Sequence, residues 1–76
     1  MGPVVEVTRS GRTVSELVLM RAERRNALSL DLLEQFSTAL ERLAADGATR
    51  AVLVRSDGPV FSAGLDLKEA ADETLA

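Results

Sequence analysis

An apolar stripe with helical spacing, followed by a short apolar run, constrains the fold of this chain most. Apolar residues recur at spacings of three and four along one stretch: Leu32, Leu33, Phe36, Ala39, Leu40 and Leu43. This period predicts an amphipathic helix, with Ser29 as its N-cap and Gly47 as its C-terminal stop. The run at 50–55, Arg-Ala-Val-Leu-Val-Arg, then predicts a strand that is buried on both faces, as in a parallel sheet.

The residues on either side of this pair complete the predicted order β-β-α-β-α. Residues 5–8 alternate apolar and polar, Ser10-Gly11 predicts a two-residue turn with a positive φ at glycine, and Thr13–Met20 predicts a returning strand. The polar segment 21–26 predicts a loop. Asp66 predicts the N-cap of a second helix, with Glu69 as its capping-box partner. The fold class is therefore α/β with a right-handed βαβ unit, which needs further strands and helices around it.

Composition excludes several classes of protein. The chain has 76 residues, one small domain or part of a larger one, and it contains no cysteine and no histidine. It therefore has no disulfide, no thiol nucleophile and no classical zinc site, and no carboxylate spacing suggests another metal. A net charge of −3 gives no basic excess for nucleic acid. No apolar run approaches the roughly 20 residues that span a bilayer, and the N-terminus lacks signal-peptide features. The absence of cysteine is compatible with the cytosol, so we expect a cytoplasmic protein.

The segment 58–69 carries the chemical signal. Ser62-Ala63-Gly64 consists of small residues, which permit close approach of the backbone to a ligand. The N–H groups at the start of the helix predicted after it lack intrahelical partners and carry partial positive charge. Together these features predict a place where a developing oxyanion is held. On the residues alone, Gly64 fits an ordinary turn glycine as well, and the pattern names no substrate.

Two motifs in a fixed order extend this interpretation. Arg24-Arg25-Asn26-Ala27-Leu28-Ser29, the amphipathic helix, the apolar run at 50–54 and the run Phe-Ser-Ala-Gly-Leu-Asp-Leu-Lys at 61–68 follow one another. This arrangement resembles the opening of the crotonase superfamily, the enoyl-CoA hydratase/isomerase family, over nearly the whole chain. The resemblance implies that residues 1–76 form the N-terminal part of one crotonase-like (ClpP/crotonase) spiral domain, incomplete and without a second domain.

The resemblance also implies a substrate and a site. Family members bind acyl-CoA thioesters, and two backbone N–H groups stabilise an enolate-like intermediate; the first of them corresponds to Leu65. The residues that correspond to the coenzyme A contacts are Arg24, Arg25, Ala27, Leu28, Ala63, Gly64, Asp66 and Leu67. Asp66 resembles a structural N-cap, with no acid or base role. Coenzyme A is expected only as part of the substrate, with no separate cofactor and no metal.

The departures from the family pattern limit what it implies. Leu65 stands where alanine is common, Ala22 where many relatives have proline, and Met20 where many have asparagine. The second oxyanion donor, the acid and base glutamates and the C-terminal helices would lie beyond residue 76. Hydratase (lyase), isomerase, hydrolase and decarboxylase reactions and the cleavage of C–C or C–halogen bonds therefore stay open, as does whether this chain is itself an enzyme. Fatty acid metabolism is the implied setting, and the isolated chain is expected to be inactive.

Three interpretations remain from the sequence. The chain is a piece of a crotonase-family enzyme, a small module that binds coenzyme A or another subunit without catalysis, or a nonfunctional remnant that does not fold stably. The expected partner is an acyl-CoA thioester, with neither nucleic acid nor membrane. Full-length relatives are expected to be trimers or hexamers, and the oligomerisation of this chain stays open.

Overall fold

The computed structural model describes residues 2–68, and they begin with a β-hairpin. Strand β1 (Val5–Arg9) pairs antiparallel with β2 (Val14–Leu19), and Val5 lies opposite Leu19. The hairpin prediction is confirmed, but the predicted two-residue turn is wrong. The reversal occupies residues 10–13, closed by the Ser10 N–H, which donates to the Val14 carbonyl at 3.0 Å. A four-residue loop does not require a positive φ at Gly11, and the φ of Gly11 is not positive.

Helix α1 (Leu30–Ala45) begins and ends where its capping residues predict. The Ser29 side chain accepts a hydrogen bond from the Leu32 N–H at 3.1 Å, and Gly47 follows the helix with a φ of 74°. Both predictions are confirmed. Only part of the apolar stripe is buried: Leu32, Ala39 and Leu43 are buried, whereas Leu33 and Leu40 are exposed. The stripe is therefore wider than the surface that the sheet offers to it.

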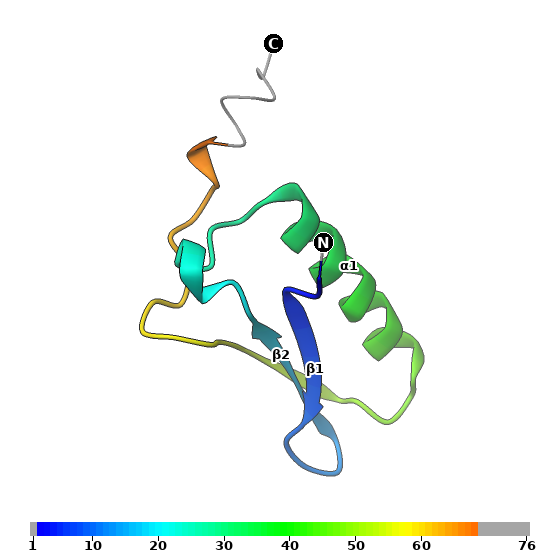
Figure 1. Cartoon of the computed structure of the whole chain (residues 1–76). Helices are drawn as coiled ribbons and strands as arrows, with labels where there is room; N and C mark the ends of the chain where they lie inside the picture. Colours follow the sequence, from blue (N-terminus) through cyan, green and yellow to red (C-terminus); the bar gives the residue numbers. More distant parts are fainter. Residues whose placement is uncertain (1, 69–76) are drawn as a thin grey trace.

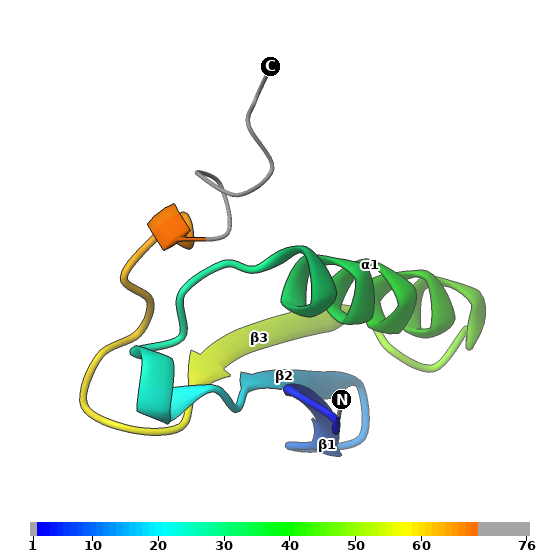
Figure 2. The same ribbon diagram turned by 45° about the horizontal axis from the view of Figure 1, so that its top comes forward.

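Strand β3 (Ala51–Ser56) runs parallel to β2, which gives the sheet order β1-β2-β3. The predicted strand–helix–strand unit is thereby confirmed. The prediction that this second parallel strand is buried on both faces is wrong, since Val52 is 36% and Leu53 50% exposed. Helix α1 lies over one face of the sheet and packs mainly against β1 and β2 (Figure 2). Within the described part of the chain, β3 is an edge strand that no helix covers fully.

The hydrophobic core lies between α1 and the central strand. Leu17 of β2 packs against Ala39 and Leu43 of α1, and Val5, Phe36 and Val54 border this cluster. One strand and one helix face therefore supply most of the buried apolar surface. No helix among the described residues is long and apolar enough to cross a membrane.

The polar segment 21–26, predicted to be a loop, contains a single 3-10 turn, η1 (Ala22–Arg24). Arg25 and Asn26 follow it with φ values of 54° and 53°, both in the left-handed region. Leu67 and Lys68 are helical, consistent with the start of the predicted second helix. Glu69, the predicted capping-box partner, lies outside the described residues.

Candidate functional site: two loops at one edge of the sheet

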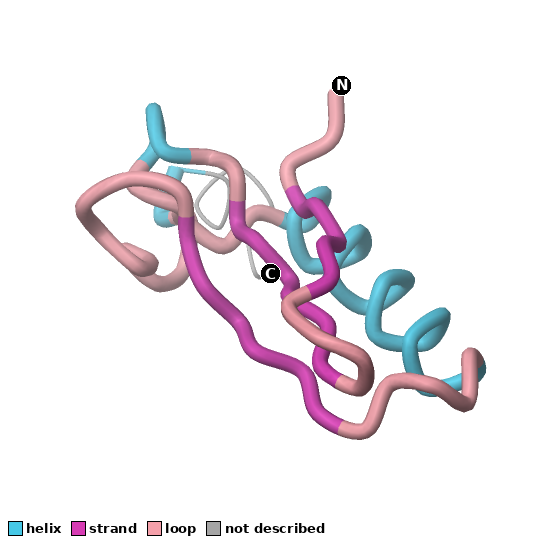
Figure 3. The backbone as a smooth tube through the Cα atoms, turned by 90° about the horizontal axis from the view of Figure 1, so that it is seen from below, coloured by secondary structure: helices cyan, strands magenta, loops and turns pink. Residues whose placement is uncertain are grey.

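Two loops meet where the parallel strands end. The first, residues 21–28, follows β2, and the second, residues 57–66, follows β3. Because parallel strands point the same way, both loops leave the sheet at the same edge, as Figure 3 shows. The loops then lie side by side (Figure 1), joined by the Ala63 N–H, which donates to the Arg25 carbonyl at 2.9 Å.

An isolated parallel bridge between Leu28 and Leu65 orients the second loop. The Leu28 N–H donates to the Gly64 carbonyl at 2.7 Å, and the Leu28 carbonyl accepts from the Asp66 N–H at 3.2 Å. The carbonyl of a trans peptide points opposite to the N–H of the same peptide plane. Since the Gly64 carbonyl points toward Leu28, the Leu65 N–H points away from it.

The Leu65 N–H differs from its neighbours in this loop. The N–H groups of Ala63 and Asp66 donate to carbonyls of the first loop, and that of Gly64 donates to the Ser62 hydroxyl at 3.0 Å. Among residues 2–68 the Leu65 N–H finds no acceptor. The backbone therefore presents one unused donor, at the position that the family resemblance implies for an oxyanion contact.

Asn26 joins the two loops, and the sequence pattern did not single it out as a site residue. It is fully buried, with a relative exposure of 0%. Its side-chain oxygen accepts from the Arg21 N–H at 2.7 Å, and its amide nitrogen donates to the carbonyls of Asp57 at 3.3 Å and Val60 at 3.2 Å. Its own carbonyl accepts from the Ser62 hydroxyl at 2.8 Å. The tolerance of asparagine for left-handed φ was the one local signal for a special role.

An ion pair between Arg21 and Asp66 forms a second link. The Arg21 Nη1 lies 3.0 Å from the Asp66 Oδ2, with the two side chains 13% and 14% exposed. The same nitrogen donates to the Ala27 carbonyl at 2.9 Å. The Asp66 carboxylate thus faces a guanidinium from the other loop, and its role as an N-cap remains a prediction. No local sequence signal pointed to Arg21.

The structure brings only some of the predicted coenzyme A contacts together. Hydrogen bonds between the loops connect Arg25, Leu28, Ala63, Gly64 and Asp66. Ala27 joins them through its carbonyl bond to Arg21. The side chain of Arg24 is exposed, and Leu67 is 76% exposed. In the described part of the chain, neither of these two side chains contacts another predicted site residue through a polar interaction.

An apolar cavity of about 260 Å³ opens between α1, the sheet and the two loops. It is lined by Leu19, Leu28, Leu32, Leu33, Phe36, Val54, Phe61 and Ser62. Leu28 belongs to the first loop and Phe61 to the second, so the cavity borders the bridge. Its lining offers apolar contact and, apart from Ser62, no polar side chain.

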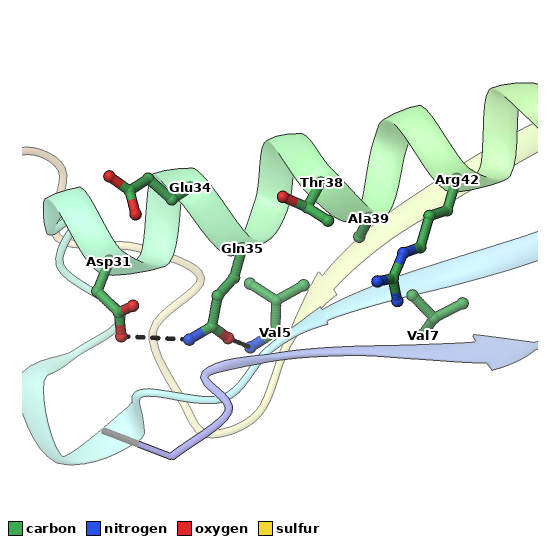
Figure 4. A pocket seen from close by; sticks show the side chains of 8 residues that line it. All are labelled: Val5, Val7, Asp31, Glu34, Gln35, Thr38, Ala39 and Arg42. Carbon is green, nitrogen blue, oxygen red and sulfur yellow. Dashed lines mark hydrogen bonds between the residues drawn. The ribbon is translucent and has the colours of Figure 1, made fainter.

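A second concavity, of about 370 Å³, lies between α1 and β1 (Figure 4). Gln35 occupies its centre: its side-chain oxygen accepts from the N–H groups of Val4 at 2.7 Å and Val5 at 3.2 Å, and its nitrogen donates to Asp31 at 3.2 Å. None of the predicted site residues lines this concavity. Gln35 serves to hold the start of β1 against the helix.

Comparison with known proteins gives the same assignment as the motifs. The sequence model of the enoyl-CoA hydratase/isomerase family matches residues 9–76. Mouse mitochondrial enoyl-CoA hydratase domain-containing protein 3 is 36% identical over 70 residues, covering 92% of this chain and 23% of the relative. Mouse mitochondrial methylglutaconyl-CoA hydratase is 43% identical over 61 residues, covering 79% of this chain and 19% of the relative.

Solved structures agree with the sequence relatives. An enoyl-CoA hydratase from Mycobacterium tuberculosis superposes with a TM-score of 0.83 at 40% identity, covering 91% of this chain and 31% of the other. One from Mycobacterium marinum gives a TM-score of 0.86 at 31% identity, covering 97% of this chain and 35% of the other. The chain spans about a quarter or less of the length of the curated relatives above. It belongs to the enoyl-CoA hydratase/isomerase family, and its fold is the N-terminal portion of the crotonase fold.

Proposed function

We propose that this chain binds acyl-CoA thioesters and that the Leu65 N–H donates to the thioester carbonyl as one donor of an oxyanion hole. The observation that carries the proposal is the direction of that N–H. It points away from Leu28 and meets no acceptor among the described residues, while the neighbouring amides of the loop are used. The names of two relatives, an enoyl-CoA hydratase domain-containing protein and a methylglutaconyl-CoA hydratase, support the substrate class.

The chemistry of a thioester explains the value of such a donor. When the α-carbon loses a proton or a nucleophile adds to an α,β-double bond, negative charge develops on the carbonyl oxygen. A donor that is already oriented stabilises this charge without reorganisation, and removing one such donor typically costs about 2.7–4 kcal/mol of transition-state stabilisation. Because the contribution is a backbone N–H, the leucine side chain at residue 65 changes the shape of the pocket without removing the donor.

The remaining predicted contacts fit coenzyme A in outline. Arg24 and Arg25 are exposed in the first loop, where guanidinium groups suit the phosphates of the ligand. Backbone groups of Ala27, Ala63 and Leu67 complete the proposed contact. Coenzyme A enters as part of the substrate, and no other cofactor is proposed. We keep the cytoplasm as the proposed compartment, although the names of several relatives place those proteins in mitochondria.

Catalysis needs more than this loop. A second oxyanion donor and an acid–base pair are assigned to no residue of 2–68, so we expect the isolated chain to bind a thioester without turning it over.

Nuclear magnetic resonance of the chain labelled with ¹⁵N tests the binding proposal. Acetyl-CoA should move the Leu65 amide signal downfield, whereas free coenzyme A should move signals near Arg24 and Arg25 and leave Leu65 in place. Leu65→Pro, which lacks the N–H, should lose the preference for the thioester, and Leu65→Ala should retain it. A Leu65 amide that does not respond to saturating acetyl-CoA would refute the proposal. Crotonyl-CoA mixed with the chain should keep its enoyl absorbance.

A second candidate function, a subunit-interaction module, has its own supporting observation. Strand β3 is an edge in the described part of the chain, and its Val52 and Leu53 are exposed. Unpaired edges with apolar side chains favour pairing with another chain. Size-exclusion chromatography with and without a full-length family member tests this candidate, and a chain that stays monomeric in both runs argues against it.

A further inference from the structure

We infer that Arg21 and Asp66 are positioning residues, which together fix the direction of the Leu65 N–H; this inference rests on the proposed function. Their ion pair is 3.0 Å long and shielded from solvent, and Asp66 directly follows the residue that carries the donor. Neither side chain is proposed to touch the reacting atoms. Both act through the backbone of the second loop.

Arg21 is anchored in the first loop before it reaches the second. Its N–H donates to the side-chain oxygen of buried Asn26 at 2.7 Å, which fixes the start of the side chain. Its Nη1 then donates to both the Ala27 carbonyl at 2.9 Å and the Asp66 carboxylate at 3.0 Å. One guanidinium nitrogen with two N–H donors therefore connects the two loops at a single point.

Asp66 is held at its side chain and at its backbone. Its carboxylate binds Arg21, and its N–H donates to the Leu28 carbonyl at 3.2 Å. The Gly64 carbonyl, which shares a peptide plane with the Leu65 N–H, accepts from the Leu28 N–H at 2.7 Å. The peptide planes on both sides of Leu65 are thereby fixed, and with them the direction of its N–H. Losing the Arg21 contact removes the charged partner that the first loop supplies to Asp66, so the Leu28–Leu65 bridge opens more readily.

Side-chain packing does little to fix the second loop around Leu65. Leu65 is 58% exposed, and a methyl group added at Gly64 would meet no atom within 4 Å. Gly64 also has a φ of 86°, in a region that glycine enters and leaves at little cost. Orientation of the donor therefore depends on the polar contacts between the loops.

The chain contains a matched control for this ion pair. Arg55 of β3 lies 2.5 Å from Glu16 of β2, with the arginine 52% exposed. This pair connects two strands, β2 and β3, and lies outside the two loops. Removing it changes the charge as removal of Arg21 does, but it leaves the Leu65 peptide untouched.

The experiment compares Arg21→Met with Arg55→Met in the whole chain. Without ligand, Arg21→Met should speed hydrogen exchange of the Leu28 and Asp66 amides by about tenfold or more, as expected for the loss of a charge-assisted hydrogen bond. It should also change the HN–Hα coupling constant of Leu65. Amides of α1 should exchange as before. With ligand, acetyl-CoA affinity should fall by roughly three- to tenfold while affinity for free coenzyme A stays constant.

The outcomes separate this inference from the proposed function. If acetyl-CoA does not shift the Leu65 amide signal of the unchanged chain, the proposed function fails. The measurements without ligand still show whether Arg21 and Asp66 fix the Leu65 peptide. The inference is overturned if Arg21→Met changes neither the hydrogen-exchange rate of the Leu28 amide nor the HN–Hα coupling constant of Leu65. It is also overturned if Arg55→Met changes both to the same extent as Arg21→Met. Should Arg21→Met lose its α1 signals, Arg21→Lys is the second variant. It keeps the charge without the guanidinium fork, so an intermediate loop effect is expected, and general unfolding of both variants overturns a specific positioning role.

Discussion

Asn26 shows how much structure one side chain organises in this chain. It adopts a φ of 53°, which asparagine tolerates better than most residues, and it buries its amide completely. In that position its oxygen accepts from one loop and its nitrogen donates to two carbonyls of the other. Every polar atom of the side chain is thereby matched, as buried amides require.

Asn26→Asp tests this arrangement with almost no change in shape. The carboxylate keeps the acceptor for the Arg21 N–H, but it places a charge against the carbonyls of Asp57 and Val60. We expect the free energy of unfolding to fall by about 3 kcal/mol, the lower end of the cost of an uncompensated buried charge. The urea midpoint at neutral pH measures this change.

Arg25→Ala is the control for Asn26→Asp. Arg25 has nearly the same backbone conformation, with a φ of 54°, but its side chain is exposed. The free energy of unfolding should change by no more than about 0.5 kcal/mol. Equal midpoints for the asparagine variant and the unchanged chain would show that the Asn26 amide does not hold the loops.

Helix α1 is the element that local signals define best. Its first turn is capped by Ser29, which is only 2% exposed, and its end is marked by the left-handed Gly47. Both signals act within a few residues of the helix end, so they operate before any tertiary contact forms. The exposed Leu33 and Leu40, in contrast, show that helical spacing does not determine how much of a stripe is covered.

Ser29→Ala should remove the cap and lower the free energy of unfolding by about 1 kcal/mol, because the Leu32 N–H loses its acceptor in a buried position. Thermal unfolding followed by circular dichroism measures the effect. Ser37→Ala, on the exposed face of the same helix, should leave the midpoint nearly unchanged or raise it slightly. If the two variants unfold alike, the cap contributes nothing.

In the molecule as a whole, two carboxylates hold segments together: Glu16 joins neighbouring strands through Arg55, and Asp46 closes the turn after α1. Arg55 donates a hydrogen bond to Glu16 and lowers the pKa of that carboxyl, with a further contribution from Ser10. The N–H groups of Thr49 and Ala48 lower the pKa of Asp46 after the helix. Both carboxylates are therefore favoured in the folded chain in their ionised form.

These shifts predict that stability falls on acidification. A carboxyl whose pKa is lowered in the folded state contributes its full stabilisation when the pH is above its pKa in the unfolded chain. That contribution is lost as the pH falls through the pKa of the folded chain. The loss should begin as the pH drops below about 4.5, the ordinary pKa of a glutamate, and continue through the ordinary 3.8 of an aspartate. Urea midpoints measured against pH should fall less steeply in Glu16→Gln and Asp46→Asn. Parallel curves for the variants and the unchanged chain would contradict this.

Local sequence signals specify the hairpin, helix α1 with both of its ends and the parallel strand after it, and the motifs identify the family. Each depends on residue type and spacing within a short stretch, which periodicity and capping report directly. The resemblance to the family also implies Leu65 as the proposed oxyanion donor. Only the tertiary structure revealed the contacts of Asn26, the Arg21–Asp66 pair and the exposure of β3. Arg21 and Asp66 are 45 positions apart, and whether such partners meet depends on how the chain folds between them. Burial of β3 depends likewise on what lies beside it, which its own apolar run does not encode.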